Sequence, residues 1–402
     1  MSNTPKIRFD GFTEDWKQYD LGKVAKYRNG KAHENAIAEQ GKYIVVNSKF
    51  VSTNGYVRKF SDKQIEPLFK NEIAFVLSDV PNGRAIARTY LVEEDDKYTL
   101  NQRIAGITPG ENVAPYFLHI LMNRNKYFLQ FDDGAKQTNL SVENVMKFED
   151  YYPSKPEQYK IGEYFETIDR FITLHESEHE KLVAMKSACL GKMFPNNDNK
   201  IPEVRFAGLT GNWNQCKLGT MGTTFTGLSG KTKEDFGHGE GRFVTYMNVY
   251  LNPVSDIVRT DLVEIDTSQN AVQYGDVFFT TSSETPEEVG MSSVWLGKSD
   301  NVYLNSFCFG FRPTMEIDPL YMAYMLRSEA VRKKIIYLAQ GISRYNISKN
   351  RVMEIEVPLP DLEEQKLIGQ YFNSLDKLIA LHQCKLEKFK QVKQSMLHNM
   401  FV

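Results

Sequence analysis

The sequence has few cysteines, no long apolar run and almost no net charge. Its four cysteines, Cys189, Cys216, Cys308 and Cys384, lie far apart without paired spacing. This pattern argues for a reducing compartment and against disulfide scaffolds or Cys-rich zinc sites. No stretch is long and apolar enough to span a bilayer, and residues 1–6 lack the apolar core of a secretion signal. We therefore expect a cytoplasmic protein.

Motifs of several enzyme classes are also missing. We find no Asn/Asp-Pro-Pro-aromatic tetrad for amino-methyl transfer, no Gly-x-Gly-x-x-Gly, no helicase box and no suggestive carboxylate pair. The net charge of −2 is unusual for a protein that binds nucleic acid alone, because phosphate neutralisation drives such binding. The charge thus favours a chain that works as one subunit of a larger assembly over one that binds nucleic acid alone.

The chain repeats itself from end to end. The segment Pro5–Gly11, followed by Trp16, returns as Pro202–Gly208 with Trp213, an offset of 213 − 16 = 197. Ile161–Phe165 returns as Ile368–Phe372, an offset of 368 − 161 = 207. A repeat of this length exceeds the ~20–50 residues of a solenoid unit and predicts two similar lobes related by a pseudo-two-fold axis. Such symmetry suits duplex DNA.

Each lobe reads as a mixed α/β domain, and the overall class as α+β. Short β-branched and aromatic runs predict strands at Tyr43–Val46, Ile73–Leu77, Phe243–Tyr246 and Val277–Thr281. Apolar residues at helical spacing after a proline predict one helix in each lobe, at 115–128 and 319–338.

Residues 157–193 and 364–400 carry apolar residues at steps of three and four, which predicts two long helices with a coiled-coil seam. The pseudo-two-fold axis would make this pair antiparallel, as a spacer between the lobes. We divide the chain into lobe 1 (1–155), a central helix (156–195), lobe 2 (196–362) and a C-terminal helix (363–402).

Polar loops within the repeated frame are candidates for DNA contact. Lys136–Asn139 and its repeat Ser343–Asn346 keep the framework but differ in the residues between. Gln, Asn and Arg are the side chains that contact adenine and guanine edges, although an ordinary polar turn explains these loops equally well. The stretch Gly227–Thr232 resembles a phosphate-binding loop with its first glycine misplaced, and it reads either as a flexible loop or as a DNA-facing one. The basic cluster Arg327–Lys334 suggests either a phosphate contact or a solvated face.

His175-Glu-Ser-Glu-His179 spells the H-E-x-x-H pattern of zinc hydrolases. Both histidines fall on the predicted seam, and the repeat has His382 at the position of His175. We therefore interpret them as seam residues that help to fix register.

These features together resemble the specificity subunit of type I restriction-modification systems. Each lobe opens with Pro-x-x-Arg-Phe-x-Gly-(Phe/Leu)-Thr-x-x-Trp and each long helix with a Glu-Gln pair, Glu157-Gln158 and Glu364-Gln365. The resemblance implies two target recognition domains that read the halves of a split DNA sequence, with helices that set the gap and dock methyltransferase subunits. It implies a bacterial or archaeal source and partners comprising double-stranded DNA, two methyltransferase subunits and nuclease-translocase subunits. It further implies no catalytic residue, metal or cofactor here, with S-adenosylmethionine, ATP and Mg²⁺ used by the partners.

The candidate DNA-binding residues come from both lobes. In the first they are Lys31, His33, Asn47, Lys49, Arg84, Lys136, Gln137, Thr138 and Asn139. In the second they are Lys231, Lys233, Asn248, Ser282, Ser283, Ser343, Arg344, Tyr345 and Asn346. The alternatives are a coiled-coil adaptor that never reads DNA and a zinc hydrolase that uses His175 and His179.

Overall fold

The computed structural model describes residues 4–33, 35–80, 83–196 and 199–402. The chain divides into two compact units, unit 1 (Met1–His175 with Lys385–Val402) and unit 2 (Glu176–Cys384). Among the described residues, no helix has the length and apolarity that a membrane crossing needs.

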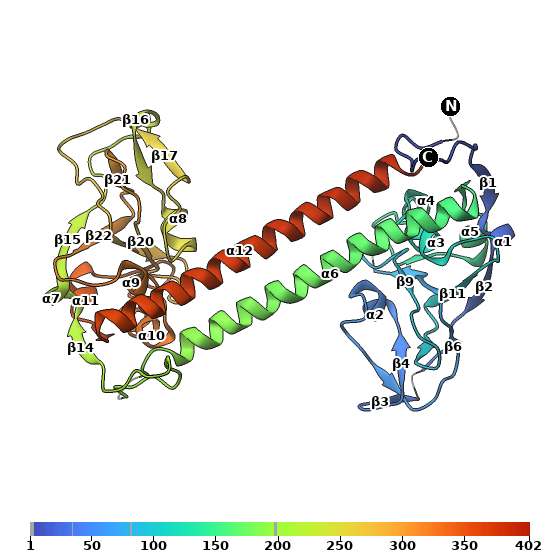
Figure 1. Ribbon diagram of the computed structural model, residues 1–402, viewed down its shortest axis with the longest axis horizontal. Helices are drawn as coiled ribbons and strands as arrows, with labels where there is room; N and C mark the ends of the chain where they lie inside the picture. The colour runs from blue at the N-terminus through green and yellow to red at the C-terminus, as the bar shows by residue number, and fades with distance from the viewer. Residues whose placement is uncertain (1–3, 34, 81–82, 197–198) are drawn as a thin grey trace. The chain divides into compact units, whose positions relative to one another are not determined.

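Unit 1 contains lobe 1, which is built on two main sheets (Figure 1). An antiparallel sheet has the order β2-β11-β7-β9, and a mixed sheet has the order β3-β5-β4-β10-β6, in which β4 and β10 are parallel. Their strands are β2 (Ala25–Asn29), β3 (Ile37–Ala38), β4 (Tyr43–Val46), β5 (Phe60–Ser61), β6 (Pro67–Leu68), β7 (Ile73–Val76), β9 (Thr89–Leu91), β10 (Tyr98–Leu100) and β11 (Ile104–Pro109). Two small sheets pair β1 (Lys17–Asp20) with β13 (Glu149–Tyr152), and β8 (Ser78–Asp79) with β12 (Thr138–Asn139). The helices of the lobe are α1 (Leu21–Val24), α2 (Ser48–Ser52), α3 (Pro115–Met122), α4 (Lys126–Leu129) and α5 (Val142–Met146).

Lobe 2, in unit 2, repeats this plan. Its antiparallel sheet has the order β15-β22-β18-β20, and its second sheet has the order β17-β16-β21. The strands are β14 (Asn214–Lys217), β15 (Gly222–Thr226), β16 (Phe236–Val244), β17 (Thr260–Val263), β18 (Val277–Thr280), β19 (Ser282–Ser283), β20 (Ser292–Val294), β21 (Val302–Leu304), β22 (Cys308–Pro313), β23 (Tyr345–Asn346) and β24 (Glu356–Leu359). β14 pairs with β24, and β19 with β23. The helices are α7 (Leu218–Met221), the 3₁₀ helix η1 (Lys233–Asp235), α8 (Tyr246–Leu251), α9 (Pro319–Met325), α10 (Glu329–Tyr337) and α11 (Lys349–Met353). The predicted mixed α/β lobes are thus confirmed.

Three element predictions were wrong in detail. The helix expected at 115–128 is two helices, because Arg124 has a left-handed φ of +55° and the Asn125 side chain then caps α4. The helix expected at 319–338 also breaks, since the Ser328 hydroxyl caps a new helix, α10. The strand expected to reach Tyr246 ends at Val244, because Thr245 caps α8.

Two long helices are present, α6 (Lys155–Lys192) and α12 (Leu362–Asn399), each of 38 residues. Both begin two residues earlier than predicted. Each unit holds part of both helices, because the division between the units falls within each of them. The finer four-part division at residues 155, 195 and 362 stays a prediction.

The contacts inside each unit show that α6 and α12 run antiparallel, as predicted. In unit 1 Asp169 of α6 pairs with Lys393 of α12, while the Phe171 and His175 rings, further along α6, stack on Phe389, with centroid distances of 5.1 Å and 5.7 Å. In unit 2 the Cys189 sulfur lies 3.5 Å from the Tyr371 hydroxyl, while Lys186, three residues earlier, reaches Asp376, five residues later. As the residue number increases along α6, the residue number of its contact on α12 decreases.

A three-residue contact, the helix triad, joins lobe 1 to both long helices within unit 1. The Tyr116 hydroxyl of α3 donates to Asp169 Oδ2 of α6 at 2.9 Å, and Lys393 Nζ of α12 donates to Asp169 Oδ1 at 2.5 Å. Burial and the Asp169 charge raise the pKa of Tyr116, so that its hydroxyl stays a donor. The equivalent triad within unit 2 consists of Tyr324, Asp376 and Lys186.

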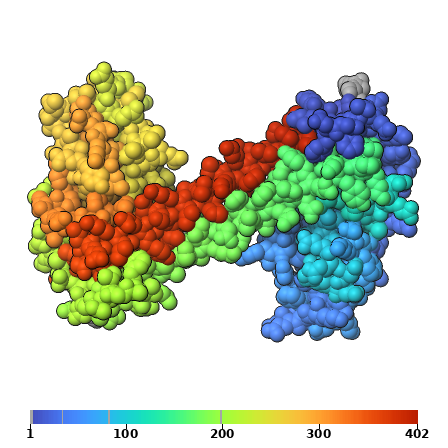
Figure 2. Space-filling view, viewed as in Figure 1, coloured from blue at the N-terminus to red at the C-terminus, as the bar shows by residue number. Residues whose placement is uncertain are grey.

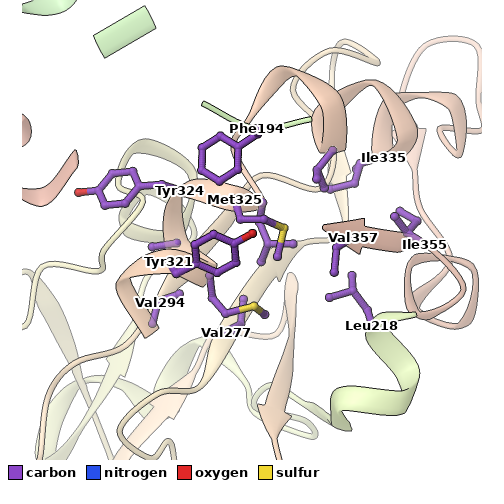
Figure 3. Packing of buried hydrophobic residues seen from close by; sticks show 14 of the residues in the cluster. Phe194, Leu218, Val277, Val294, Tyr321, Tyr324, Met325, Ile335, Ile355 and Val357 are labelled. Atoms are coloured by element: carbon purple, nitrogen blue, oxygen red, sulfur yellow. The ribbon is translucent and has the colours of Figure 1, made fainter. Parts of the chain in front are cut away.

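The core of each lobe is also completed by the long helices. In unit 1 Phe401, beyond the end of α12, stacks on Phe117 of α3 at 5.6 Å and meets the Trp16 ring at 6.3 Å. The end of the red helix adjoins the dark blue N-terminal segment in Figure 2, where Ile7 N donates to Asn399 O at 2.9 Å. In the equivalent cluster of unit 2 the Phe194 ring contacts Trp213, Tyr321 and Phe372. Phe194 and Tyr321 lie close together in Figure 3. The repeated tryptophans are therefore core residues that fix each lobe on its helices.

Candidate nucleic-acid interface

Each lobe forms the same small two-stranded contact at its repeated polar loop. In lobe 1, Thr138 pairs with Asp79 and Asn139 with Ser78. The Gln137 amide donates to Ser78 Oγ at 2.7 Å. Ser78 was not among the residues predicted to bind DNA, although its repeat, Ser282, was. The offset between the two serines, 282 − 78 = 204, lies between the repeat offsets of 197 and 207, and this correspondence could have identified Ser78.

Lobe 2 reproduces this contact with a different donor. Ser282 pairs with Asn346 and Ser283 with Tyr345, and the Arg344 guanidinium donates to Ser282 Oγ at 3.1 Å. The structure therefore brings together five of the predicted residues of lobe 2. We call each such contact, β8–β12 and β19–β23 with the residue before the second strand, a reading hairpin for short, although its two strands are distant in the sequence and no single turn joins them.

The reading hairpins present their polar side chains outward at alternate positions, as a strand requires. Gln137 and Asn139 are exposed, while Thr138 between them is buried and donates to Asp132 Oδ1 at 2.9 Å. Arg344 and Asn346 are likewise exposed on either side of the half-buried Tyr345. Lys136 and Ser343 lie exposed next to these strands. An anchored amide can both donate to and accept from an adenine edge, and an anchored guanidinium can donate to the acceptors of a guanine edge.

Arg84 lies on the loop that leaves the reading hairpin of lobe 1. The Asp79 carboxylate accepts hydrogen bonds from the backbone N–H groups of Val80, Ala85 and Ile86, at 2.9, 2.6 and 3.1 Å. This carboxylate therefore ties the end of β8 to the backbone that carries Arg84, whose side chain is exposed.

The other candidates of lobe 1 lie on and around the mixed sheet, away from the reading hairpin. His33 is buried, and its ring nitrogens lie 2.7 Å from Lys31 O and 2.8 Å from Thr99 Oγ1. Lys31 pairs with Glu66 at 2.8 Å. Asn47 caps α2 through its side chain, and Lys49 on that helix is exposed. Their roles in DNA binding stay predictions.

In lobe 2, Asn248 and Lys231 have partners within the lobe. Asn248 is buried, and its amide holds the following loop by donating to Asp256 O and Arg259 O, both at 2.8 Å. Lys231 pairs with Asp266 at 2.8 Å, and this ammonium is the main cause of the lowered pKa of Asp266. The phosphate-loop-like stretch leads only into η1, which begins at the exposed Lys233 and has three residues. A long helix with its N-terminus facing a phosphate does not follow it.

The two arginines of the basic cluster at 327–334 face inward, while Lys333 is exposed and pairs with Glu329. The Arg327 guanidinium donates to backbone oxygens of Val249, Tyr250 and Ser292, among others, and burial lowers its pKa to about 10. Arg332 donates to Gly290 O at 2.7 Å, and burial lowers its pKa to about 10 as well. These two arginines hold loops together, so the phosphate interpretation of the cluster loses its main residues.

The described ranges contain no group of three or more His, Cys, Asp or Glu side chains placed to hold a metal ion. His175, in the zinc-like pattern, stacks on Phe389 of α12. This packing agrees with the interpretation of His175 as a helix-seam residue.

Comparison with known proteins identifies a family whose model matches both halves of the chain. Residues 13–184 and 211–391 match the model of a family described as type I restriction modification DNA specificity domain. The putative type I restriction enzyme MjaX specificity subunit of Methanocaldococcus jannaschii is 25% identical over 181 residues, 44% of this chain and 42% of that protein. The StySPI specificity subunit of Salmonella potsdam is 24% identical over 200 residues, 49% of this chain and 41% of that protein. The matches thus span less than half the length of either relative.

The fold is shared with a solved structure. The crystal structure of the S subunit of a type I restriction-modification system from M. genitalium superposes with a TM-score of 0.66, covering 99% of both chains at 14% identity. At this identity the likeness shows the fold alone.

Proposed function

Because this chain belongs to the type I restriction-modification DNA specificity domain family, we propose that each of its lobes reads one half of a split DNA target. The observation that carries the proposal is the reading hairpin, which occurs twice with one frame and different side chains. A glutamine in lobe 1 and an arginine in lobe 2 donate to equivalent serines. Unlike side chains on like frames should read unlike half-sites.

The rest of the complex follows from this role. The chain acts without catalytic residues, as the recognition subunit of an assembly in a bacterial or archaeal cytoplasm. Two methyltransferase subunits with S-adenosylmethionine would modify the target, and nuclease-translocase subunits with ATP and Mg²⁺ would cleave unmodified DNA. The antiparallel helices α6 and α12 would dock the methyltransferase subunits and set the gap between the half-sites.

Exchange of the exposed hairpin residues tests the readout in each lobe separately. Gln137→Ala with Asn139→Ala should relax the first half-site only, because each lost bidentate contact costs ~1–3 kcal/mol of discrimination. Arg344→Ala with Asn346→Ala should relax the second half-site only. The measurement is the set of methylated sites in a genome exposed to the complete methyltransferase complex.

Each pair of exchanges is the control for the other, since the half-site of the untouched lobe should stay the same. Ser78→Ala keeps Gln137 but removes its anchor, and it should give a weaker relaxation at the first half-site. A single continuous palindrome, or unchanged methylation in every variant, would exclude the reading hairpins as the specificity elements.

A further inference from the structure

Three arginines of lobe 1 converge beside its reading hairpin. Arg88 Nε donates to Arg84 O at 2.7 Å. Arg124, from the turn between α3 and α4, donates through Nη1 to Ile86 O at 3.3 Å and through its backbone N–H to Ala87 O at 2.8 Å. We call Arg84, Arg88 and Arg124 the arginine cluster. Residues from two distant parts of the sequence thus place three cations on one short segment.

The arginine cluster is not neutralised by carboxylates of the described residues. Among the described residues, the arginines that form ion pairs are others, such as Arg28 and Arg312. None of the three arginines of the cluster forms an ion pair within the described part of the chain. Burial lowers the pKa of Arg88, and the charges of Arg124 and Arg84 lower it further. Like charges gathered in this way oppose one another unless an anion lies between them. The arrangement therefore favours a bound anion.

Two residues that position this cluster have strained backbone conformations. Ala87 and Arg124 both have left-handed backbones, with φ of +57° and +55°, a conformation that costs energy for residues other than glycine. Strand pairing makes Thr89 equivalent to Ser292, because each faces the matching phenylalanine, Phe75 or Phe279.

The equivalence of Thr89 and Ser292 identifies the counterparts in lobe 2 of the residues that precede Thr89. The counterpart of Ala87 is Gly290, which adopts φ of +64° without that penalty, and the counterpart of Arg88 is Met291. In lobe 2 the single guanidinium of Arg332 donates to Glu287 O and Val289 O, the counterparts of Arg84 O and Ile86 O. One arginine thus holds this backbone in lobe 2, whereas lobe 1 gathers three arginines at the equivalent place, more than are needed to hold the loop.

We propose that Arg84, Arg88 and Arg124 bind one backbone phosphate of the DNA beside the half-site read by lobe 1, and that lobe 2 lacks this contact. The inference rests on the proposed function. Asp79 lies on β8, which pairs with β12 next to Gln137, and its carboxylate holds the backbone on the C-terminal side of Arg84. A base reached by Gln137 therefore has its flanking phosphates near the cluster. Guanidinium groups match the oxygens of a phosphate, and such contacts fix position without reading sequence.

The test is the salt dependence of DNA binding by the complete methyltransferase complex. The probe is a labelled 30-base-pair duplex that carries the target mapped from methylated sites, beside a scrambled duplex of equal composition. Arg84→Gln, and Arg88→Gln with Arg124→Gln, should each weaken binding. The slope of log affinity against log salt should fall by about 0.9 on loss of one phosphate contact. The methylated sequence should not change in either half-site.

Lys26→Gln is the matched control. Lys26 is exposed on β2, the opposite edge of the same sheet from β9, the strand that follows Arg88, and its exchange should leave the slope unaltered. Arg84→Gln guards against misfolding, because that side chain is exposed. An unaltered slope in Arg84→Gln and in a folded Arg88/Arg124 variant would overturn the inference while the wild type still prefers the target duplex. Loss of methyltransferase binding at a constant slope would also overturn it, by assigning the cluster to a protein partner. Failure of the wild type to prefer the target duplex would instead refute the proposed function.

Discussion

Replacement of Arg8 by methionine is expected to lower the free energy of unfolding of unit 1 by about 3 kcal/mol or more. Arg8 forms a two-pronged ion pair with Glu157 in the first turn of α6, at 2.6 and 2.8 Å, and also donates to Glu14 O. The Glu157 side chain is completely buried. Without Arg8 its carboxylate would remain in the core without a cation, which costs far more than the pair itself contributes.

The double variant Arg8→Met, Glu157→Leu separates these two effects. It removes the buried charge together with its partner and should recover most of the lost stability, as measured by urea unfolding of the full chain. Lys23→Met, which breaks the exposed pair with Asp20, should show no resolvable change, since surface pairs contribute little. A double variant no more stable than Arg8→Met would show that the loss comes from packing of the arginine and not from the stranded carboxylate.

The repeat itself explains why the scaffold could be predicted from the sequence. Arg205 binds the buried Glu364 as Arg8 binds Glu157, at 2.7 Å. The glutamines that follow these glutamates, Gln158 and Gln365, accept hydrogen bonds from the backbones at the starts of α3 and α9. Residues repeated in both halves thus hold each lobe to its long helix. Their recurrence in the sequence was sufficient to predict the lobes and the helices.

The candidate site was less predictable, because it depends on what the repeat does not share. Gln137 and Arg344 were found as differing residues within a common frame. Arg84 was predicted, but Arg88 and Arg124 were not, since Arg124 lies 124 − 88 = 36 residues from Arg88 in the sequence and is placed by a left-handed turn that propensities do not signal. Composition also misled at Arg327, where a basic run suggested a surface although the guanidinium caps backbone carbonyls inside the lobe. Local patterns give no information about which way such a side chain turns.

Insertion of one heptad into both long helices, after Ser177 and after Cys384, is expected to keep both half-sites and to lengthen the gap between them. The two acid–base pairs of the helix triads lie equally far apart on each helix, since 186 − 169 = 17 and 393 − 376 = 17. Equal spacing on antiparallel helices lets both triads close in a single register. Seven residues added to both helices preserve that equality and the seam, and they add about 10 Å of helix, or at most about three base pairs.

The same heptad in α6 alone makes the spacings 24 and 17, so the two triads cannot form at the same time, and we expect methylation to fail. Sequencing of methylated sites compares the two insertion variants with the parent. A double insertion that methylates both half-sites at the original gap would show that α6 and α12 do not measure the target, because a longer ruler in an intact register has to change the distance that it sets.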